Sequence, residues 1–126
     1  MEPAGIVLIS HSAKVAEGIK DIIHQVEKNV PIALAGGTDD DRIGTSVEKI
    51  QTAIDQAHTE GGVLLIYDLG SAMMNAEIAV EMSDFDDIEI ANAPLLEGAY
   101  VAAVESGMGK SLAQVKQAAE RALQED

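Results

Sequence analysis

A histidine between two serines stands directly after a short apolar run near the start of the chain. The run covers residues 6–9, and Ser10, His11 and Ser12 follow it. Such a run predicts a buried strand that leads into a helix. In open α/β sheets, ligands and chemistry lie at the carboxyl ends of the strands. His11 is therefore a candidate acid, base or nucleophile, although a capping or packed histidine would also suit this position.

Asp68 follows the third predicted strand and is the candidate partner of His11. If the first and third strands are neighbours, the two side chains come within reach, because adjacent strands lie about 4.8 Å apart. A carboxylate that accepts from the Nδ1–H of an imidazole fixes its tautomer. The Nε2 lone pair would then face solvent, which predicts an oriented nucleophile. The alternative is a buried structural hydrogen bond.

Small and hydroxyl-bearing residues at the same strand ends suit a tetrahedral anion. Helix N-termini bind phosphate through free N–H groups and the helix dipole, and glycines let backbone N–H groups approach closely. A transient phosphohistidine on His11 fits this pattern better than phosphate-ester catalysis, because nothing resembles a magnesium–nucleotide site. We expect no metal and no cofactor. The residues predicted to hold the phosphate are Ser12, Gly36, Gly37, Thr38, Gly70 and Ser71.

Strands and helices alternate along the chain. Apolar strands are predicted at 6–9, 32–35, 63–67 and 88–91, with a helix after each and one more after Ser111. This order predicts a single doubly wound α/β domain over residues 1–126, a three-layer sandwich with a central parallel four-stranded sheet. The expected strand order is 2-1-3-4, with the switch point between the first and third strands.

The helices carry apolar stripes and start signals. Capping boxes are predicted at Thr45–Glu48 and Ser111–Gln114. The expected core side of the first helix comprises Val15, Ile19, Ile22, Ile23 and Val26. Packing candidates in the third helix are Ala72, Met73, Ala76, Ala79, Val80 and Met82, and the pair Met73-Met74 would lie in the core or at an oligomer contact.

Composition excludes several classes of partner. The formal net charge is -14 with only eight Lys and Arg, so nucleic acid and anionic membranes are not expected partners. The absence of cysteine excludes disulfides and thiolate chemistry. No run is long enough to span a membrane, and the first residues lack signal-peptide features. We therefore expect a cytoplasmic protein.

Several short patterns resemble functional motifs but have a simpler interpretation. Gly109-Lys110-Ser111 is similar to the end of a P-loop, but that motif also requires an earlier glycine, at the position of Val104. We interpret it as a helix stop followed by an N-cap. The acidic residues 39–41 lack the ligand spacing of a calcium loop and predict a solvated loop. His24 lies within the first predicted helix and is expected to pack or to be exposed, and His58 lies in a last helical turn, where the helix dipole favours a cation.

Four motifs of this chain resemble the mannose-type EIIA domains of the bacterial phosphotransferase system. They are Ile9-Ser10-His11-Ser12, Ala35-Gly36-Gly37-Thr38, Ile43-Gly44-Thr45 and Asp68-Leu69-Gly70-Ser71-Ala72. The last motif and the stretch Ala93-Pro94-Leu95-Leu96-Glu97-Gly98 are similar to one branch, the phosphotransfer subunits of PEP-dependent dihydroxyacetone kinases. Sugar-importing relatives tend to carry a second glycine at the position of Ser71.

The resemblance implies a phosphocarrier, a phosphotransferase component. Phosphoryl groups would pass from phosphoenolpyruvate through enzyme I and HPr to His11, with Asp68 as its orienting partner. In this branch the acceptor is ADP held by the nucleotide-binding subunit of dihydroxyacetone kinase. This chain carries no HPr or enzyme I module, so it would depend on separate ones. The family is usually homodimeric.

Three alternatives remain open from the sequence. The first is an EIIA domain that serves a mannose-type sugar permease. The second is a receiver-like signalling domain with Asp68 as acceptor, although receivers need an acidic pair where Ser10, His11 and Ser12 stand. The third is a non-catalytic interaction domain in which His11 is only a cap.

Overall fold

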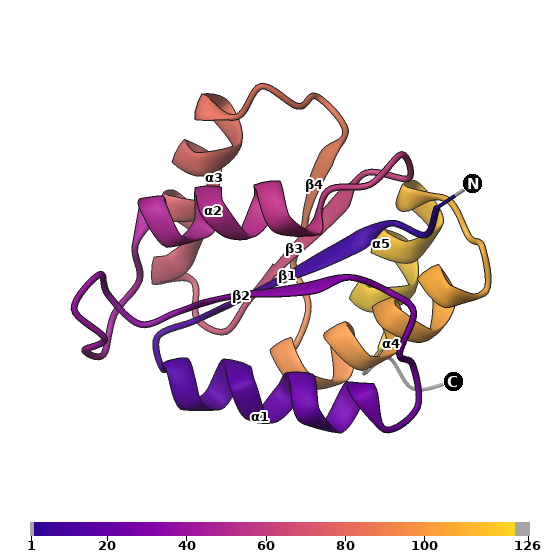
Figure 1. Ribbon diagram of the computed structural model, residues 1–126, viewed down its shortest axis with the longest axis horizontal. Helices are drawn as coiled ribbons and strands as arrows, with labels where there is room; N and C mark the ends of the chain where they lie inside the picture. The colour runs from indigo at the N-terminus through magenta and orange to yellow at the C-terminus, as the bar shows by residue number, and fades with distance from the viewer. Residues whose placement is uncertain (1, 123–126) are drawn as a thin grey trace.

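Four parallel strands form the centre of the computed structural model, which describes residues 2–122 (Figure 1). The sheet order is β2-β1-β3-β4, as the sequence predicts. Strands β1 and β3 are the two inner strands, with Ile9 beside Tyr67 at their carboxyl ends. The elements are β1 (Gly5–Ser10), α1 (Ala13–His24), β2 (Ile32–Gly36), α2 (Val47–Ala57), β3 (Val63–Tyr67), α3 (Ser71–Met82), β4 (Ile88–Ala91), α4 (Leu95–Gly107) and α5 (Leu112–Glu120).

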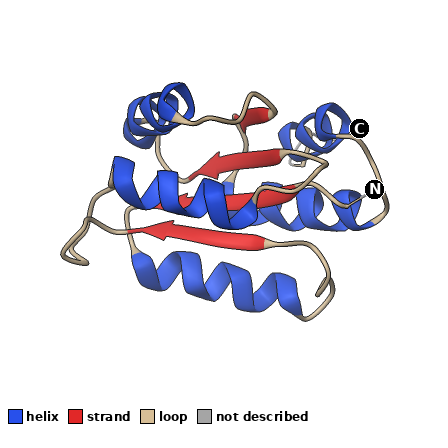
Figure 2. Ribbon diagram, turned by 45° about the horizontal axis from the view of Figure 1, so that its top comes forward, coloured by secondary structure: helices blue, strands red, loops and turns tan. Residues whose placement is uncertain are grey.

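Helices cover both faces of the sheet, which explains why the inner strands are apolar throughout (Figure 2). Alternate side chains of a strand point to opposite faces. Ile6 and Leu8 face α1, α4 and α5, whereas Val7 and Ile9 face α2 and α3. The predicted three-layer α/β architecture is confirmed, and it brings the ends of β1 and β3 together at one edge.

Serine side chains begin three of the helices. Ser12, Ser46 and Ser111 cap α1, α2 and α5, each by accepting a hydrogen bond from a backbone N–H three residues later. The capping box at Ser111 is confirmed, with Gln114 bonding back to the Ser111 N–H. The box predicted at Thr45 is wrong, because the following serine takes the cap. The Thr45 hydroxyl instead accepts a hydrogen bond from Asn75.

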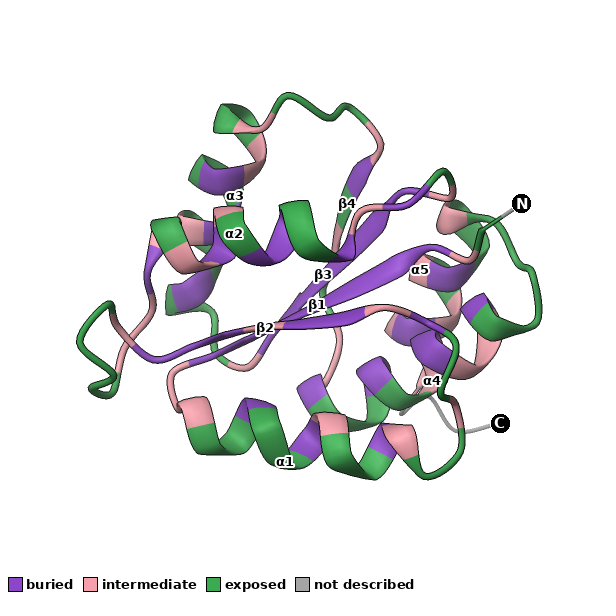
Figure 3. Cartoon of the chain, viewed as in Figure 1, coloured by how far each residue is buried: buried purple, intermediate pink, exposed green. Residues whose placement is uncertain are grey.

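Figure 3 shows that much of the outer face of α1 is exposed. Ala16, Ile19 and Ile23 are buried, but Val15, Ile22 and Val26 are 48%, 50% and 56% exposed, so their predicted place in the core is wrong. The sheet meets a narrower stripe of the helix than the pattern of large side chains indicates. In α3, too, only a narrow stripe is buried, and it consists of the alanines Ala72, Ala76 and Ala79. Its exposed large residues include Met73, Met74 and Met82.

The predicted helix stop near residue 109 is confirmed. Gly109 has a φ of 89°, the left-handed conformation that ends a helix, and Ser111 then opens α5. Among residues 2–122 there is no helix with the length and apolar character needed to cross a lipid bilayer.

Candidate functional site

The imidazole of His11 and the carboxylate of Asp68 meet at the carboxyl edge of the sheet. Nδ1 of His11 lies 2.9 Å from Oδ1 of Asp68, as the placement of β1 beside β3 predicts. Both side chains are 21% exposed. A carboxylate can only accept hydrogen bonds, so Nδ1 must carry the proton. In the neutral ring, Nε2 therefore holds a lone pair.

Four donors surround the carboxylate of Asp68. Oδ1 also accepts from the N–H of Leu69 at 2.8 Å, and Oδ2 accepts from the hydroxyl of Ser10 at 3.0 Å and the N–H of His11 at 2.9 Å. Burial raises the pKa of Asp68, but the hydrogen bonds from His11 and Ser10 outweigh it and hold this pKa below its ordinary value of 3.8. Asp68 is thus an ionised, fixed acceptor at neutral pH.

Ser10 is a site residue that the sequence analysis did not assign a role. Its side chain is fully buried, donates to Asp68 and accepts from the Ser12 N–H at 3.0 Å. In the sequence, Ser10 is the last residue of an apolar strand, and only its hydroxyl group could have indicated these contacts. Ser10 therefore couples the carboxylate to the start of α1.

Nε2 of His11 does not face solvent alone, which differs from the prediction. The hydroxyl of Ser71 lies 3.0 Å away and donates to the Nε2 lone pair. Ser71 is the first residue of α3, and within the described residues no hydrogen bond occupies the N–H groups of Gly70 and Ser71. The open end of α3 therefore faces the nitrogen that would react.

The remaining predicted phosphate ligands already have partners inside the protein. The Gly37 N–H donates to the Ser10 carbonyl, and the Thr38 N–H donates to the Arg42 carbonyl. Gly36 has no side chain because a Cβ there would lie 2.6 Å from Cα of Ala13. Ser12 caps α1. Phosphate binding by these four residues stays a prediction, and in this conformation their engaged groups serve the scaffold.

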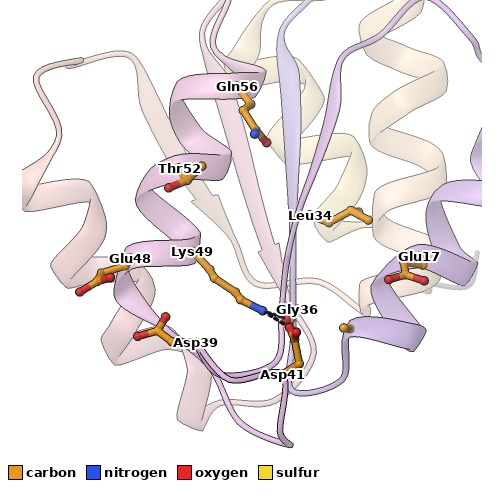
Figure 4. A pocket seen from close by; sticks show the side chains of 10 residues that line it. Glu17, Leu34, Gly36, Asp39, Asp41, Glu48, Lys49, Thr52 and Gln56 are labelled. Carbon is orange, nitrogen blue, oxygen red and sulfur yellow. Dashed lines mark hydrogen bonds and ion pairs between the residues drawn. The ribbon is translucent and has the colours of Figure 1, made fainter.

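The acidic segment 39–41 is tied to the scaffold. Lys49 of α2 donates to the Gly36 carbonyl at 3.0 Å and to Asp41 at 2.7 Å, inside a cavity of about 590 Å³ between α1 and α2 (Figure 4). The cavity lining includes neither His11 nor Asp68. The loop before α2 therefore has a fixed path past the site.

The other two histidines lie away from this edge. His24 ends α1, and His58 caps α2 at the amino ends of the strands. His58 bonds Asp87 at 2.7 Å and stacks on Phe85, with ring centroids 3.6 Å apart. Within residues 2–122, no three His, Asp or Glu side chains converge as metal ligands. A His–Asp pair thus occurs twice, but only His11 stands at the carboxyl edge.

The lowered pKa of Asp68 makes a prediction about stability. An acid whose pKa falls on folding stabilises the folded state above its unfolded pKa, and this contribution is lost as pH falls through the folded pKa. Ser10→Ala removes one donor and moves the folded pKa back toward 3.8. We expect this variant to lose about 1–3 kcal/mol of unfolding free energy at pH 7. This loss of unfolding free energy should be smaller at about pH 3, where the carboxylate of Asp68 begins to be protonated. Urea denaturation at pH 7 and at pH 3 measures both losses.

Ser111→Ala is the matched control for this measurement. It also removes a serine hydroxyl that bonds a backbone N–H, but that hydroxyl contacts no carboxylate. Its loss, about 1 kcal/mol for a helix cap, should not depend on pH. Equal losses for Ser10→Ala at both pH values would contradict the coupling to Asp68.

The fold and the site define a class of α/β domain with a carboxylate-oriented histidine at the switch point of a parallel sheet. The sequence model EIIA-man, described as the PTS system fructose IIA component, matches residues 5–116. The chain belongs to this mannose-type EIIA family of the phosphotransferase system.

Relatives with curated names resemble this chain over most of its length. A protein of Listeria innocua, "PEP-dependent dihydroxyacetone kinase 1, phosphoryl donor subunit DhaM", is 47% identical over 107 residues, 85% of each chain. A Lactococcus lactis protein, "PTS-dependent dihydroxyacetone kinase, phosphotransferase subunit DhaM", is 38% identical over 119 residues and covers 94% of this chain and 95% of its own. The Escherichia coli phosphoryl donor subunit DhaM is 32% identical, and the match spans 25% of its length.

A solved structure shares the fold. The crystal structure of a protein of unknown function aligns with a TM-score of 0.82 at 32% identity and covers 94% of both chains.

Proposed function

We propose that this protein is a phosphocarrier that accepts a phosphoryl group from phospho-HPr on Nε2 of His11. It passes the group to ADP bound on the nucleotide-binding subunit of a dihydroxyacetone kinase. The observation that carries this proposal is the pair of contacts on the His11 ring. Nδ1 is held by an ionised carboxylate, and Nε2 lies at the open end of α3.

The transfer needs only the lone pair of Nε2. That lone pair attacks phosphorus, the phosphorus–nitrogen bond to the donor histidine breaks, and its electron pair returns to the donor. The ring of His11 becomes cationic, and the Asp68 carboxylate stabilises that charge through the retained Nδ1–H. Attack by a β-phosphate oxygen of ADP then forms ATP and restores the Nε2 lone pair.

The Ser71 hydroxyl and the N–H groups at the start of α3 suit the phosphorylated state. Once phosphorus occupies Nε2, the hydroxyl can rotate to donate to a phosphoryl oxygen. The two open N–H groups and the helix dipole favour negative charge at the same place. These groups give the phosphoryl group a binding site that neither transfer partner has to supply.

The names of the relatives support the choice of acceptor. The Listeria innocua and Lactococcus lactis proteins, both named as DhaM subunits of dihydroxyacetone kinases, match 85% and 94% of the chain. Donors already occupy both oxygens of Asp68, which argues against its use as the acceptor in a receiver-like mechanism. We further place the protein in the cytoplasm, where phosphoenolpyruvate is available, and expect a homodimer.

The deciding experiment follows the phosphoryl group to its acceptor. The protein is phosphorylated with phosphoenolpyruvate, enzyme I and HPr, purified, and mixed with a nucleotide-binding kinase subunit loaded with ADP. We expect the intact mass of the carrier to fall by one phosphoryl group while ATP forms. The same kinase subunit without nucleotide is the matched control and should leave the carrier phosphorylated.

A sugar-permease EIIA is the second candidate, favoured by the description of the matching family as a fructose IIA component. Transfer to the next sugar-permease component, with none to the ADP-loaded kinase subunit, would establish this alternative. A chain that gains no phosphoryl group from phospho-HPr would overturn both proposals.

A further inference from the structure

Two adjacent residues of the loop before α2 bond the two sides of the site: Gly44 contacts His11, and Thr45 contacts Asn75 in α3. The Gly44 N–H donates to the carbonyl of His11 at 2.9 Å. The Thr45 hydroxyl accepts from the side-chain amide of Asn75 in α3 at 2.7 Å. The proposed transfer uses neither contact, so their purpose requires a separate explanation.

Asn75 stands one helical turn after Ser71. Residues four apart in a helix share a face, and helical side chains lean toward the N-terminus. A bond that holds Asn75 therefore limits rotation of α3 about its axis. That rotation sets the distance between Ser71 Oγ and Nε2 of His11, now 3.0 Å.

The start of α3 has no side-chain cap. Its N-cap is Gly70, which offers no side chain to bond the first turn, whereas Ser12 and Ser46 cap their own helices. Gly70 is exposed, and apart from its chain neighbours no atom lies within 4 Å of the position that a Cβ there would occupy. Thr45 adds a hydrogen bond from outside the helix, one turn after Ser71.

The loop that carries Thr45 has side-chain contacts of its own. Lys49 ties Asp41 to the Gly36 carbonyl, and Ser46 donates to Asp39. These contacts connect the loop to the end of β2 and the start of α2. The hydrogen bond from Gly44 to His11 connects it to the end of β1. These contacts fix the position of Thr45 relative to the backbone of His11.

We propose that Thr45 and Asn75 are positioning residues that hold the Ser71 hydroxyl against Nε2 of His11. This inference rests on the proposed function for its purpose, but its geometry can be tested without any phosphoryl transfer. Removal of the Thr45–Asn75 hydrogen bond lets the first turn of α3 move and weakens the contact of Ser71 with Nε2.

Nitrogen-15 NMR of the unphosphorylated protein measures this contact directly. An unprotonated imidazole nitrogen is shielded when it accepts a hydrogen bond. Ser71→Ala should therefore move the Nε2 resonance of His11 downfield, and Asn75→Ala and Thr45→Val should each move it in the same direction. Thr45→Ser keeps an acceptor oxygen and should leave the resonance near its original position. Glu77→Ala, on an exposed residue of the same helix, is the matched control.

A double-mutant cycle separates positioning from general destabilisation. Asn75→Ala should slow phosphorylation of His11 by phospho-HPr by about fivefold, the effect of one net hydrogen bond. In a Ser71→Ala background the same change should have no further effect on either the rate or the Nε2 resonance.

An unchanged Nε2 resonance in both Asn75→Ala and Thr45→Val, with a shift in Ser71→Ala, would overturn the positioning role. An equal further loss in the Ser71→Ala background would also overturn it. Failure of phospho-HPr to phosphorylate the protein would instead remove the proposed function and leave the NMR result to decide the contact.

Discussion

His11→Ala is expected to abolish the mass gain of one phosphoryl group when the protein is incubated with phosphoenolpyruvate, enzyme I and HPr. The reason is that His11 supplies the only imidazole nitrogen, within the described part of the chain, that a carboxylate orients at the carboxyl edge of the sheet. The substitution removes the imidazole ring, so no nitrogen lone pair remains to attack phosphorus. Intact-mass spectrometry after a timed incubation measures the result.

The other histidines provide the controls for this experiment. His24→Ala and His58→Ala should each keep the full mass gain, because His24 ends α1 and His58 lies at the amino edge with Asp87 and Phe85. A phosphorylated His11→Ala protein, with the gain lost in one of the other two variants, would place the reactive nitrogen elsewhere. Acid lability of the modified protein, with stability to alkali, identifies the adduct as phosphohistidine.

Asp68→Asn is expected to slow phosphorylation of His11 by about 10²- to 10⁴-fold. In the unsubstituted protein, both oxygens of the Asp68 carboxylate accept hydrogen bonds. Two of the donors are the backbone N–H groups of His11 and Leu69, one on each oxygen. In either orientation of an asparagine side chain, its NH₂ group would face one of these backbone N–H groups, so that two donors would meet. With that group toward His11 Nδ1, the amide donates and the ring proton moves to Nε2, which removes the reactive lone pair. Rates from quenched reactions measure the effect.

Asp87→Asn is a closely matched control, since Asp87 also bonds a histidine at 2.7 Å. It should leave the phosphorylation rate unchanged while changing the environment of His58. Asp68→Ala, which cannot donate to Nδ1, should slow transfer less than Asp68→Asn. A normal rate in Asp68→Asn would exclude Asp68 from the mechanism.

The strand order and the meeting of His11 with Asp68 could be predicted from the sequence because they follow from rules about long segments. Apolar runs define the strands, and alternation with helices makes the sheet parallel. The carboxyl ends then lie at one edge, whatever the detailed loop conformations. The family resemblance, confirmed by the match over residues 5–116, depends on residues at these same strand ends.

Contacts within the loops could not be predicted in this way. Residue types at 36–38 suit phosphate binding, but the N–H groups of Gly37 and Thr38 turn toward protein carbonyls. The bond between Ser71 and Nε2 depends on the rotation of α3, which residue spacing does not determine. In α1, the large apolar residues Val15 and Ile22 suggested a core position, yet small Ala16 lies in the core because the helix packs closely on the sheet.

Assembly of the proposed site requires a long-range event, because β1 and β3 must pair before His11 meets a carboxylate 57 residues away. A nascent chain that has left the ribosome only as far as β2 holds the histidine with neither Asp68 nor Ser71. Under the proposed function, competence to carry a phosphoryl group therefore arises only after β3 has been made and has paired with β1. We therefore expect a chain in which β1 and β3 are not paired to be a poor phosphoryl acceptor.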